Sequence, residues 1–270
     1  MTSDEKMNCM FSILSGIKWT NAERYRHGVQ GLLKDCSSHE QFAAVEHVLK
    51  NLSYRRSNDL EAGAANAGKV ISELWGLEPA NTLVAGLAEP NKTCGSTAYL
   101  RAIELALART WSSSIYTTFG SAFRHRNGRQ NLVLVDDFIG SGQKFSERID
   151  RLLRNPKTAD FKIHVVAFAG MATGIDRVAL KVENRIAVKE QQEKCISSVR
   201  PPEKSSEYAL HMAALEKKIF SHTGQYSFGY GQSEAAFFLE AFNIPNNNFP
   251  ILWWEKYADG TPRPTLFTRR

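Results

Sequence analysis

The sequence predicts an α/β fold built on a parallel sheet. From about residue 82 onward, strand-like apolar runs alternate with segments of helical periodicity, the pattern that gives parallel sheets. One predicted strand, residues 131–136, contains the continuous apolar run Leu132 to Val135, as in strands that are covered on both faces. We expect an N-terminal helical extension over residues 1–78, and an α/β domain with an aromatic C-terminal segment over residues 79–270.

The first 78 residues are expected to be helical. Thr20 to Glu23 and Ser37 to Glu40 each match a capping box, in which a Ser or Thr is followed three residues later by a Glu. Each box precedes a segment whose apolar residues recur at helical spacing. A further helix from about Asp59 to Trp75 is expected to end near Gly76.

The core elements follow in a regular order. We predict strands near residues 82–87, 115–119, 131–136, 161–169 and 185–189, and helices near residues 96–111, 143–154 and 172–182. A polar segment with two successive prolines predicts a loop over residues 190–206, before a last helix near residues 206–221. Ligands of such sheets bind at the carboxyl ends of the strands, where we expect the functional site.

Composition limits the classes of function. The 270 residues, 43% of them hydrophobic, can bury a sizeable core, and the formal charge of +6 attracts phosphate-bearing ligands or nucleic acid. The basic residues gather in three groups, at Arg124 to Arg129, Arg148 to Arg154, and Arg263 to Arg270. The second group has helical spacing, which favours a solvated helix face.

Cysteine usage and hydropathy indicate a cytoplasmic protein. The four cysteines lie far apart and form no Cys-x-x-Cys pair, which favours neither a zinc site nor a disulfide framework. The N-terminus is unlike a signal peptide, and no run reaches the ~18 apolar residues of a membrane span. We expect a soluble protein of the reducing cytoplasm, with no membrane partner.

An acidic pair, Asp136 and Asp137, lies at the end of the apolar run and is followed by a glycine-containing turn. Because successive strand side chains point to opposite faces, the two carboxylates cannot both be core residues. Carboxylates accept hydrogen bonds from hydroxyls, and a turn at the start of a helix gathers N–H groups that suit a phosphate. The predicted phosphate-binding residues are Gly140, Ser141, Gly142, Gln143 and Lys144.

Other glycine-loop interpretations fit less well. A dinucleotide-binding fingerprint needs a third glycine near Phe145, and a phosphate loop of nucleotide hydrolases needs Ser or Thr directly after Lys144. A simple structural role stays open, because Asp is a favoured residue at the start of a helix.

The string NLVLVDDFIGSG, residues 131–142, resembles the ribose-phosphate signature of type I phosphoribosyltransferases. The resemblance implies a phosphoribosyltransferase-like core, in which Asp136 and Asp137 are the catalytic pair that binds the ribose hydroxyls. It assigns the 5′-phosphate to the turn at Ser141 and Gly142. The sequence departs from the signature at Gln143 and Lys144, where the family has a small residue and then Thr.

The resemblance also implies a pyrophosphate loop after the first core strand. Lys92, Gly95 and Ser96 are the matching residues, and an ordinary strand-to-helix turn is the alternative. The ligand would be phosphoribosyl diphosphate or a nucleotide, with Mg²⁺ as cofactor. No side chain is expected to bind this metal directly; a contact through water would be to Asp136 or Asp137.

A basic connection precedes the acidic strand. In the family, a mobile loop in this region closes over the pyrophosphate, and Arg124, His125 and Arg126 are the candidates for that role. A plain solvated loop is an equally good interpretation of these residues.

The C-terminal segment points to a narrower group. The string Asn243 to Trp254, together with VDDFIGSG, resembles phosphoribosyltransferase-like effectors of bacterial conflict systems, including retron-associated defence operons. That resemblance implies an effector role in antiviral defence and a reverse transcriptase with its RNA or DNA as partner. From the residues alone, Trp253 and Trp254 suit core packing or stacking on a base, and core packing is favoured for at least one.

Two classes of function stay open. The first is an enzyme that binds a ribose 5-phosphate or phosphoribosyl diphosphate moiety and forms or cleaves the bond at the anomeric carbon, by positioning and charge. The second is a non-catalytic module that senses a nucleotide or binds nucleic acid or protein, which the missing Thr favours. The sequence does not identify the base, the acceptor or the oligomeric state.

Overall fold

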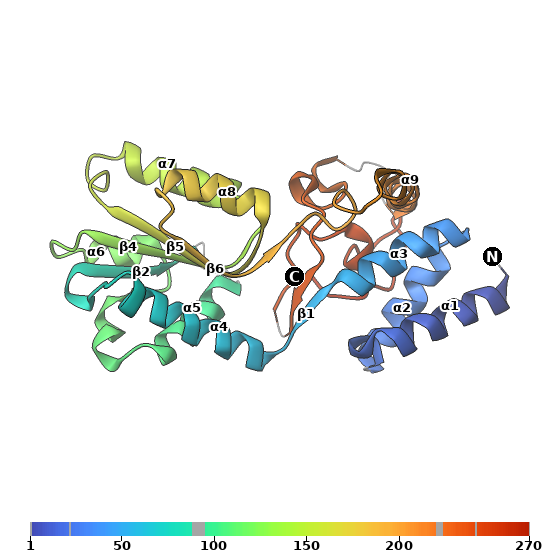
Figure 1. Cartoon of the computed structure of the whole chain (residues 1–270), viewed down its shortest axis with the longest axis horizontal. Helices are drawn as coiled ribbons and strands as arrows, with labels where there is room; N and C mark the ends of the chain where they lie inside the picture. The colour runs from blue at the N-terminus through green and yellow to red at the C-terminus, as the bar shows by residue number, and fades with distance from the viewer. Residues whose placement is uncertain (1, 22, 88–94, 220–223, 241, 270) are drawn as a thin grey trace. The chain divides into compact units, whose positions relative to one another are not determined.

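The computed structural model describes all residues except 1, 22, 88–94, 220–223, 241 and 270. The chain forms two compact units: one combines residues 1–55 with 193–270, and the other spans residues 56–192 (Figure 1). This division differs from the expected boundary at residue 78. The helix after residue 56 packs on the parallel sheet, and the C-terminal segment packs with the N-terminal helices.

The unit of residues 56–192 is an α/β sandwich with a parallel five-stranded sheet. Its strand order is β3-β2-β4-β5-β6, and every pairing is parallel, which confirms the predicted fold class. The elements are α4 (Ser57–Lys69), a π-helical turn (Val70–Leu74), β2 (Thr82–Gly86), α5 (Gly95–Ala106), β3 (Ile115–Tyr116), α6 (Phe119–Arg124), β4 (Asn131–Ile139), α7 (Gln143–Arg154), β5 (Lys162–Met171), α8 (Ala172–Lys181) and β6 (Ile186–Gln192).

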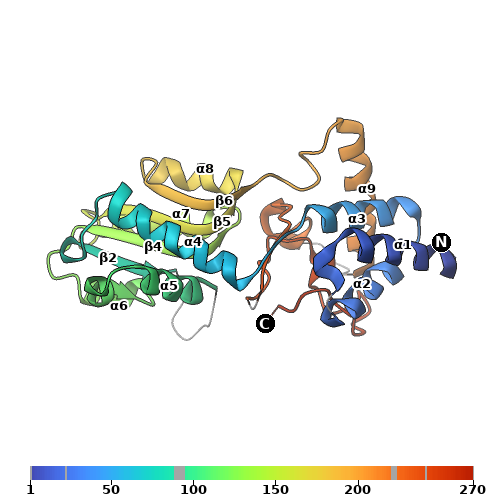
Figure 2. The ribbon, with the colours of Figure 1, turned by 60° about the horizontal axis from the view of Figure 1, so that its bottom comes forward.

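Helices cover both faces of this sheet (Figure 1, Figure 2). On one face, Leu132 and Leu134 of β4 pack with Phe145 and Ile149 of α7. On the other face, Phe168 of β5 meets the ring of a tyrosine of α5 edge-on and lies against α4. Because apolar side chains leave β4 in both directions, its sequence is a continuous apolar run instead of an alternating one.

The strand order reverses direction between β2 and β4. From β2 the chain first adds β3 on one side, and then crosses back to add β4, β5 and β6 on the other. In open α/β sheets, ligands bind in the crevice that such a switch creates at the carboxyl ends of the strands. The last pair between the two strands is Gly86 with Val135, so residues 136–139 of β4 extend past the end of β2 into this region.

The second unit is mainly helical. Its elements are α1 (Ser3–Gly16), α2 (Glu23–Asp35), α3 (His39–Asn51), β1 (Ser53–Arg55), α9 (Pro202–Ile219) and β7 (Phe237–Leu239). β1 and β7 form a two-stranded parallel sheet that the sequence analysis did not predict. Helix α3 begins one residue later than expected, because Ser38 and not Ser37 accepts the capping hydrogen bond from the N–H of Gln41.

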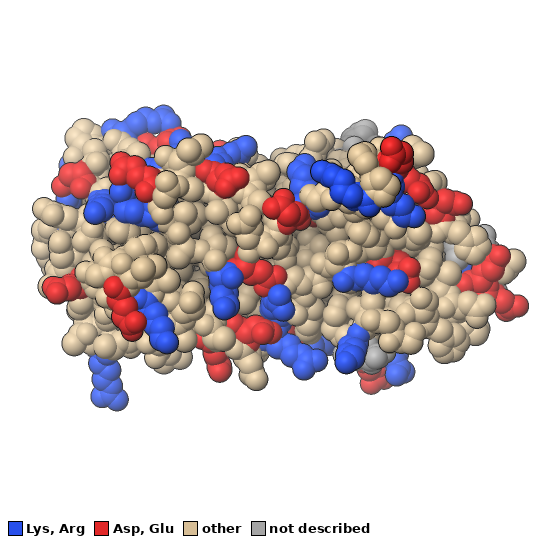
Figure 3. All heavy atoms as spheres, viewed as in Figure 1, with Lys and Arg blue, Asp and Glu red and all other residues tan. Residues whose placement is uncertain are grey.

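The expected capping box at Thr20 is also absent. The Thr20 hydroxyl is buried and donates to the carbonyl of Ile17, inside a short 3-10 helix that precedes α2. In the part of the chain that the structure describes, no helix has the length and apolar character to cross a membrane. On the face drawn in Figure 3, Lys and Arg side chains alternate with Asp and Glu and do not gather into one basic area.

Candidate functional site

The acidic pair lies inside β4. This strand extends three residues further at its carboxyl end than the predicted strand. Asp136 pairs with Ala167 of β5, and the strand continues to Ile139. By strand alternation Asp136 points to the α7 face and Asp137 to the α5 face. Asp136 is buried at 3% exposure, whereas Asp137 is half-buried. Both carboxylates therefore lie at the strand switch, next to different helices.

Lys144 forms an ion pair with Asp136, the buried member of the acidic pair. Its Nζ donates to Oδ2 of Asp136 at 2.8 Å, and the N–H of Asp137 donates to Oδ1 at 3.1 Å. The Asp136 side chain is 4% exposed, whereas that of Lys144 is 56% exposed. Each carboxylate oxygen of Asp136 thus has a donor, and the ammonium group connects the strand to the start of α7.

The two carboxyl groups act on each other. Burial raises the pKa of Asp137 well above its usual value, and the charge of Asp136 and a hydrogen bond between the two side chains raise it further. The ammonium group of Lys144 works in the opposite direction and lowers the pKa of Asp137. The proton affinity of Asp137 therefore depends on both of its charged neighbours, Asp136 and Lys144.

The turn after β4 adopts the backbone that the sequence predicts. Gly142 has a φ of 74°, in the left-handed region, and stands directly before the first residue of α7. The hydroxyl of Ser141 accepts from the N–H of Gln143 at 3.4 Å. Gly140, Ser141, Gln143 and Lys144 are all at least partly exposed around this turn, so an anion could reach the first turn of α7.

A glycine that the sequence analysis missed supports this turn. A methyl group built on Gly174, in the first turn of α8, would lie 2.0 Å from the carbonyl oxygen of Gly140. One built on Gly142 would lie 2.6 Å from the carbonyl oxygen of Gly174. The two backbones touch, and only glycine allows it. The signal available in the sequence was a glycine at the third position of a helix that directly follows a strand, where a close backbone contact is expected.

The predicted pyrophosphate loop is only partly described. Lys92 lies outside the described residues, while Gly95 and Ser96 form the first turn of α5. A methyl group built on Gly95 would lie 2.1 Å from Oδ2 of Asp137, so the carboxylate occupies the space that any other side chain would need. The structure therefore brings Gly95 together with Asp137.

The predicted mobile-loop residues lie at the opposite edge of the sheet. Arg126 bonds to the carbonyl of Lys157 at 2.7 Å and pairs with Asp160, before the amino end of β5. The ring of His125 stacks on the ring of Tyr116, with 5.2 Å between the ring centroids. Arg124 is the last residue of α6. Because α6 carries the chain away from the carboxyl edge, the structure does not bring Arg124, His125 or Arg126 to the acidic pair.

The donor set of the site does not fit a metal held by the protein. In the described ranges, no group of three or more His, Cys, Asp or Glu side chains could hold an ion. Mg²⁺ prefers six oxygen ligands at near-octahedral geometry, and both oxygens of Asp136 already accept hydrogen bonds.

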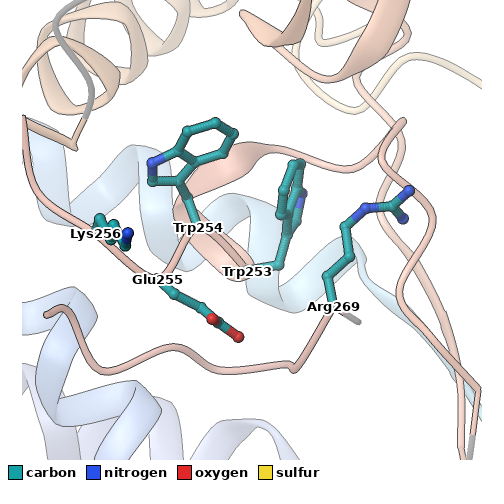
Figure 4. Close-up of a pocket in the computed structure, with 5 residues that line it drawn as sticks. All are labelled: Trp253, Trp254, Glu255, Lys256 and Arg269. Carbon is teal, nitrogen blue, oxygen red and sulfur yellow. The ribbon is translucent and has the colours of Figure 1, made fainter. Parts of the chain in front are cut away.

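The C-terminal tryptophans form a pocket of about 340 Å³ in the other unit (Figure 4). Trp253, Trp254, Glu255, Lys256 and Arg269 line it. Trp253 is 6% exposed and its indole N–H donates to the carbonyl of Asn248, so this ring is a core residue as expected. Trp254 is half-buried, 5.5 Å from Trp253 between ring centroids.

Comparison with known proteins gives a family and remote structural likenesses. No curated protein matches the sequence. The structure of the AQ2163 protein from Aquifex aeolicus is similar at 8% identity and a TM-score of 0.34, over 72% of this chain and 86% of that one. The family model PRTase-CE matches residues 3–269. The chain therefore belongs to the PRTase-CE family of phosphoribosyltransferase-like conflict effectors.

Proposed function

We propose that the carboxyl edge of the sheet binds the ribose 5-phosphate part of a nucleotide or of phosphoribosyl diphosphate. The observation that supports this most is the arrangement of Asp136, Asp137 and Lys144 beside the turn of Gly140 to Gly142, at the strand switch. The two acids would accept hydrogen bonds from the ribose hydroxyls, and the turn and the start of α7 would hold the phosphate.

The reaction that suits this site is bond formation or cleavage at the anomeric carbon. In such a reaction positive charge develops on the ribose ring, and a nearby carboxylate stabilises it. The carboxylate of Asp136, which Lys144 contacts at 2.8 Å, would supply that stabilisation without a nucleophile on the protein. When the ligand carries a diphosphate, Mg²⁺ would enter with it, bound to the phosphate oxygens.

Membership of the PRTase-CE family supports an effector role. The chain would act on nucleotides in the bacterial cytoplasm. It would do so as the effector of an antiphage system of the retron type. Its partner there would be a reverse transcriptase with its RNA or DNA.

The test is the double substitution Asp136→Asn with Asp137→Asn. We expect wild-type protein to bind phosphoribosyl diphosphate in calorimetry, and the variant to show no binding while its unfolding temperature stays within a few degrees. Asp150→Asn on α7 is a matched control, because Asp150 is paired with Lys181 away from the turn. Equal binding by wild type and double variant would refute the site.

A non-catalytic sensor is the second candidate, and the bond between Lys144 and Asp136 favours it. A carboxylate that already faces an ammonium group stabilises a developing positive charge on the ribose less, which suits a site that binds a ligand without converting it. Mass spectrometry of cellular nucleotides after expression separates the two candidates. A metabolite that falls with the wild type and not with the double variant supports the enzyme; unchanged metabolites with intact binding support the sensor.

A further inference from the structure

The position of Lys144 bears on which ligand the site takes. A metal ion beside Asp136 would compete for the carboxylate oxygens with the ammonium at 2.8 Å and the Asp137 N–H at 3.1 Å. It would also have to enter a place where the carboxylate is 4% exposed. Mg²⁺ gives up its water shell reluctantly, so such an exchange is unfavourable.

The ammonium group already supplies the charge that a metal would bring. It contacts Asp136 directly and lowers the pKa of Asp137, so it compensates both acids. Its positive charge makes the acidic pair and Lys144 together one charge unit less negative than the pair alone. An anionic ligand meets less repulsion at this site than at a bare pair of acids.

Lys144 also lies where the phosphate would bind. It is the second residue of α7, two positions after Gly142, and more than half of its side chain is exposed. Its ammonium group donates to Asp136, and its backbone belongs to the first turn of α7. The positive charge of Lys144 therefore lies close to both the acids proposed for the sugar and the turn proposed for the phosphate.

We propose that Lys144 takes the place of a divalent cation at the acidic pair, so that the site binds a ribose 5-phosphate monoester without metal. This inference rests on the proposed function and narrows its ligand class. The ligands would be ribose 5-phosphate or a nucleoside monophosphate, in preference to a magnesium-bound diphosphate.

The experiment measures the dissociation constant of ribose 5-phosphate by calorimetry, once in EDTA and once in MgCl₂. It compares the wild type, Lys144→Met and Lys181→Met. Lys181 forms the same kind of Lys–Asp pair, at 2.6 Å with Asp150, near the far end of α8, so it controls for the loss of an ion pair. Thermal unfolding of each variant checks that the fold is kept.

For the wild type and Lys181→Met we expect dissociation constants that agree within twofold in EDTA and Mg²⁺. For Lys144→Met we expect binding at least tenfold weaker in EDTA, with a recovery of fivefold or more when Mg²⁺ compensates the exposed acids. Wild-type binding that requires Mg²⁺ would overturn the role of Lys144 and leave the proposed function standing, as would wild-type affinity in Lys144→Met. No binding of ribose 5-phosphate by wild type under either condition, together with no binding of phosphoribosyl diphosphate, would overturn both.

Discussion

Glu216 of α9 gives a prediction about stability that can be worked from the structure. Its side chain is fully buried, and its oxygens accept from the N–H of Phe228 at 3.1 Å and the hydroxyl of Ser227 at 3.1 Å. Burial raises the pKa of Glu216 from its ordinary value of 4.5 to about 7, although these two hydrogen bonds act to lower it. The folded protein therefore binds a proton at this site more tightly than the unfolded chain does.

The sign of the pH dependence follows from that difference. The stabilisation is fully present below about pH 4.5 and is lost as the pH rises through about 7. A shift of this size corresponds to about 3 kcal/mol, of which about 2.5 kcal/mol is lost between pH 5 and pH 8. Glu216→Gln keeps the shape of the side chain and removes its titration, and the hydroxyl of Ser227 can accept from the new amide.

The assay is guanidinium unfolding followed by tryptophan fluorescence, at pH 5 and pH 8. From pH 5 to pH 8, the free energy of unfolding of the wild type should fall by about 2.5 kcal/mol relative to that of Glu216→Gln. The other titrating groups are the same in both proteins, so their contributions cancel. Glu203→Gln on the same helix is exposed and should change that difference by less than about 0.5 kcal/mol. Parallel pH profiles of wild type and Glu216→Gln would refute the argument.

Two further substitutions test the packing on which the fold and the site depend. Gly174→Ala should lower the free energy of unfolding by about 2–3 kcal/mol and abolish phosphate-ligand binding, because the new methyl group would lie 2.0 Å from the Gly140 oxygen. Gly120→Ala is the control, because its nearest contact is at 4.0 Å. It should be close to neutral in the same denaturation and calorimetry experiments. Arg263→Met should cost about 3–5 kcal/mol, because it removes the cation at 2.7 Å and leaves the buried carboxylate of Asp35 with only the hydroxyl of Tyr257. Asp35→Asn in the Arg263→Met background should recover part of that loss in urea unfolding, and full additivity of the two changes would contradict the pairing.

The parts of the fold that local pattern specifies were predictable. Helix α7 spans Gln143–Arg154, the range expected from the apolar spacing of Phe145, Ile149 and Leu152. The strand of the acidic pair was also predicted, with its carboxyl end three residues short. Apolar periodicity and turn residues act over a few positions, and these elements need nothing else.

Pairings between distant segments were not predictable in the same way. The strands β1 and β7 have three residues each and join Ser53–Arg55 to Phe237–Leu239, so neither has a local signature of its own. The placement of Arg124 to Arg126 depends on which edge of the sheet α6 reaches. Chain connectivity in three dimensions decides this, and a basic composition does not reveal it.

The composition of the chain also does not show which of its charges are accessible to a ligand. Composition counts Arg263 within a basic C-terminal group, yet its side chain is fully buried, paired with Asp35 and bonded to the carbonyls of Ile251 and Trp254. Its charge is compensated inside the unit and attracts no ligand. Lys144 is the opposite case, because it keeps more than half of its side chain in solvent while it bonds to Asp136. The proposed binding of phosphate therefore depends on where a few cations lie and not on the number of basic residues, and Lys144 is the cation that lies beside the proposed site.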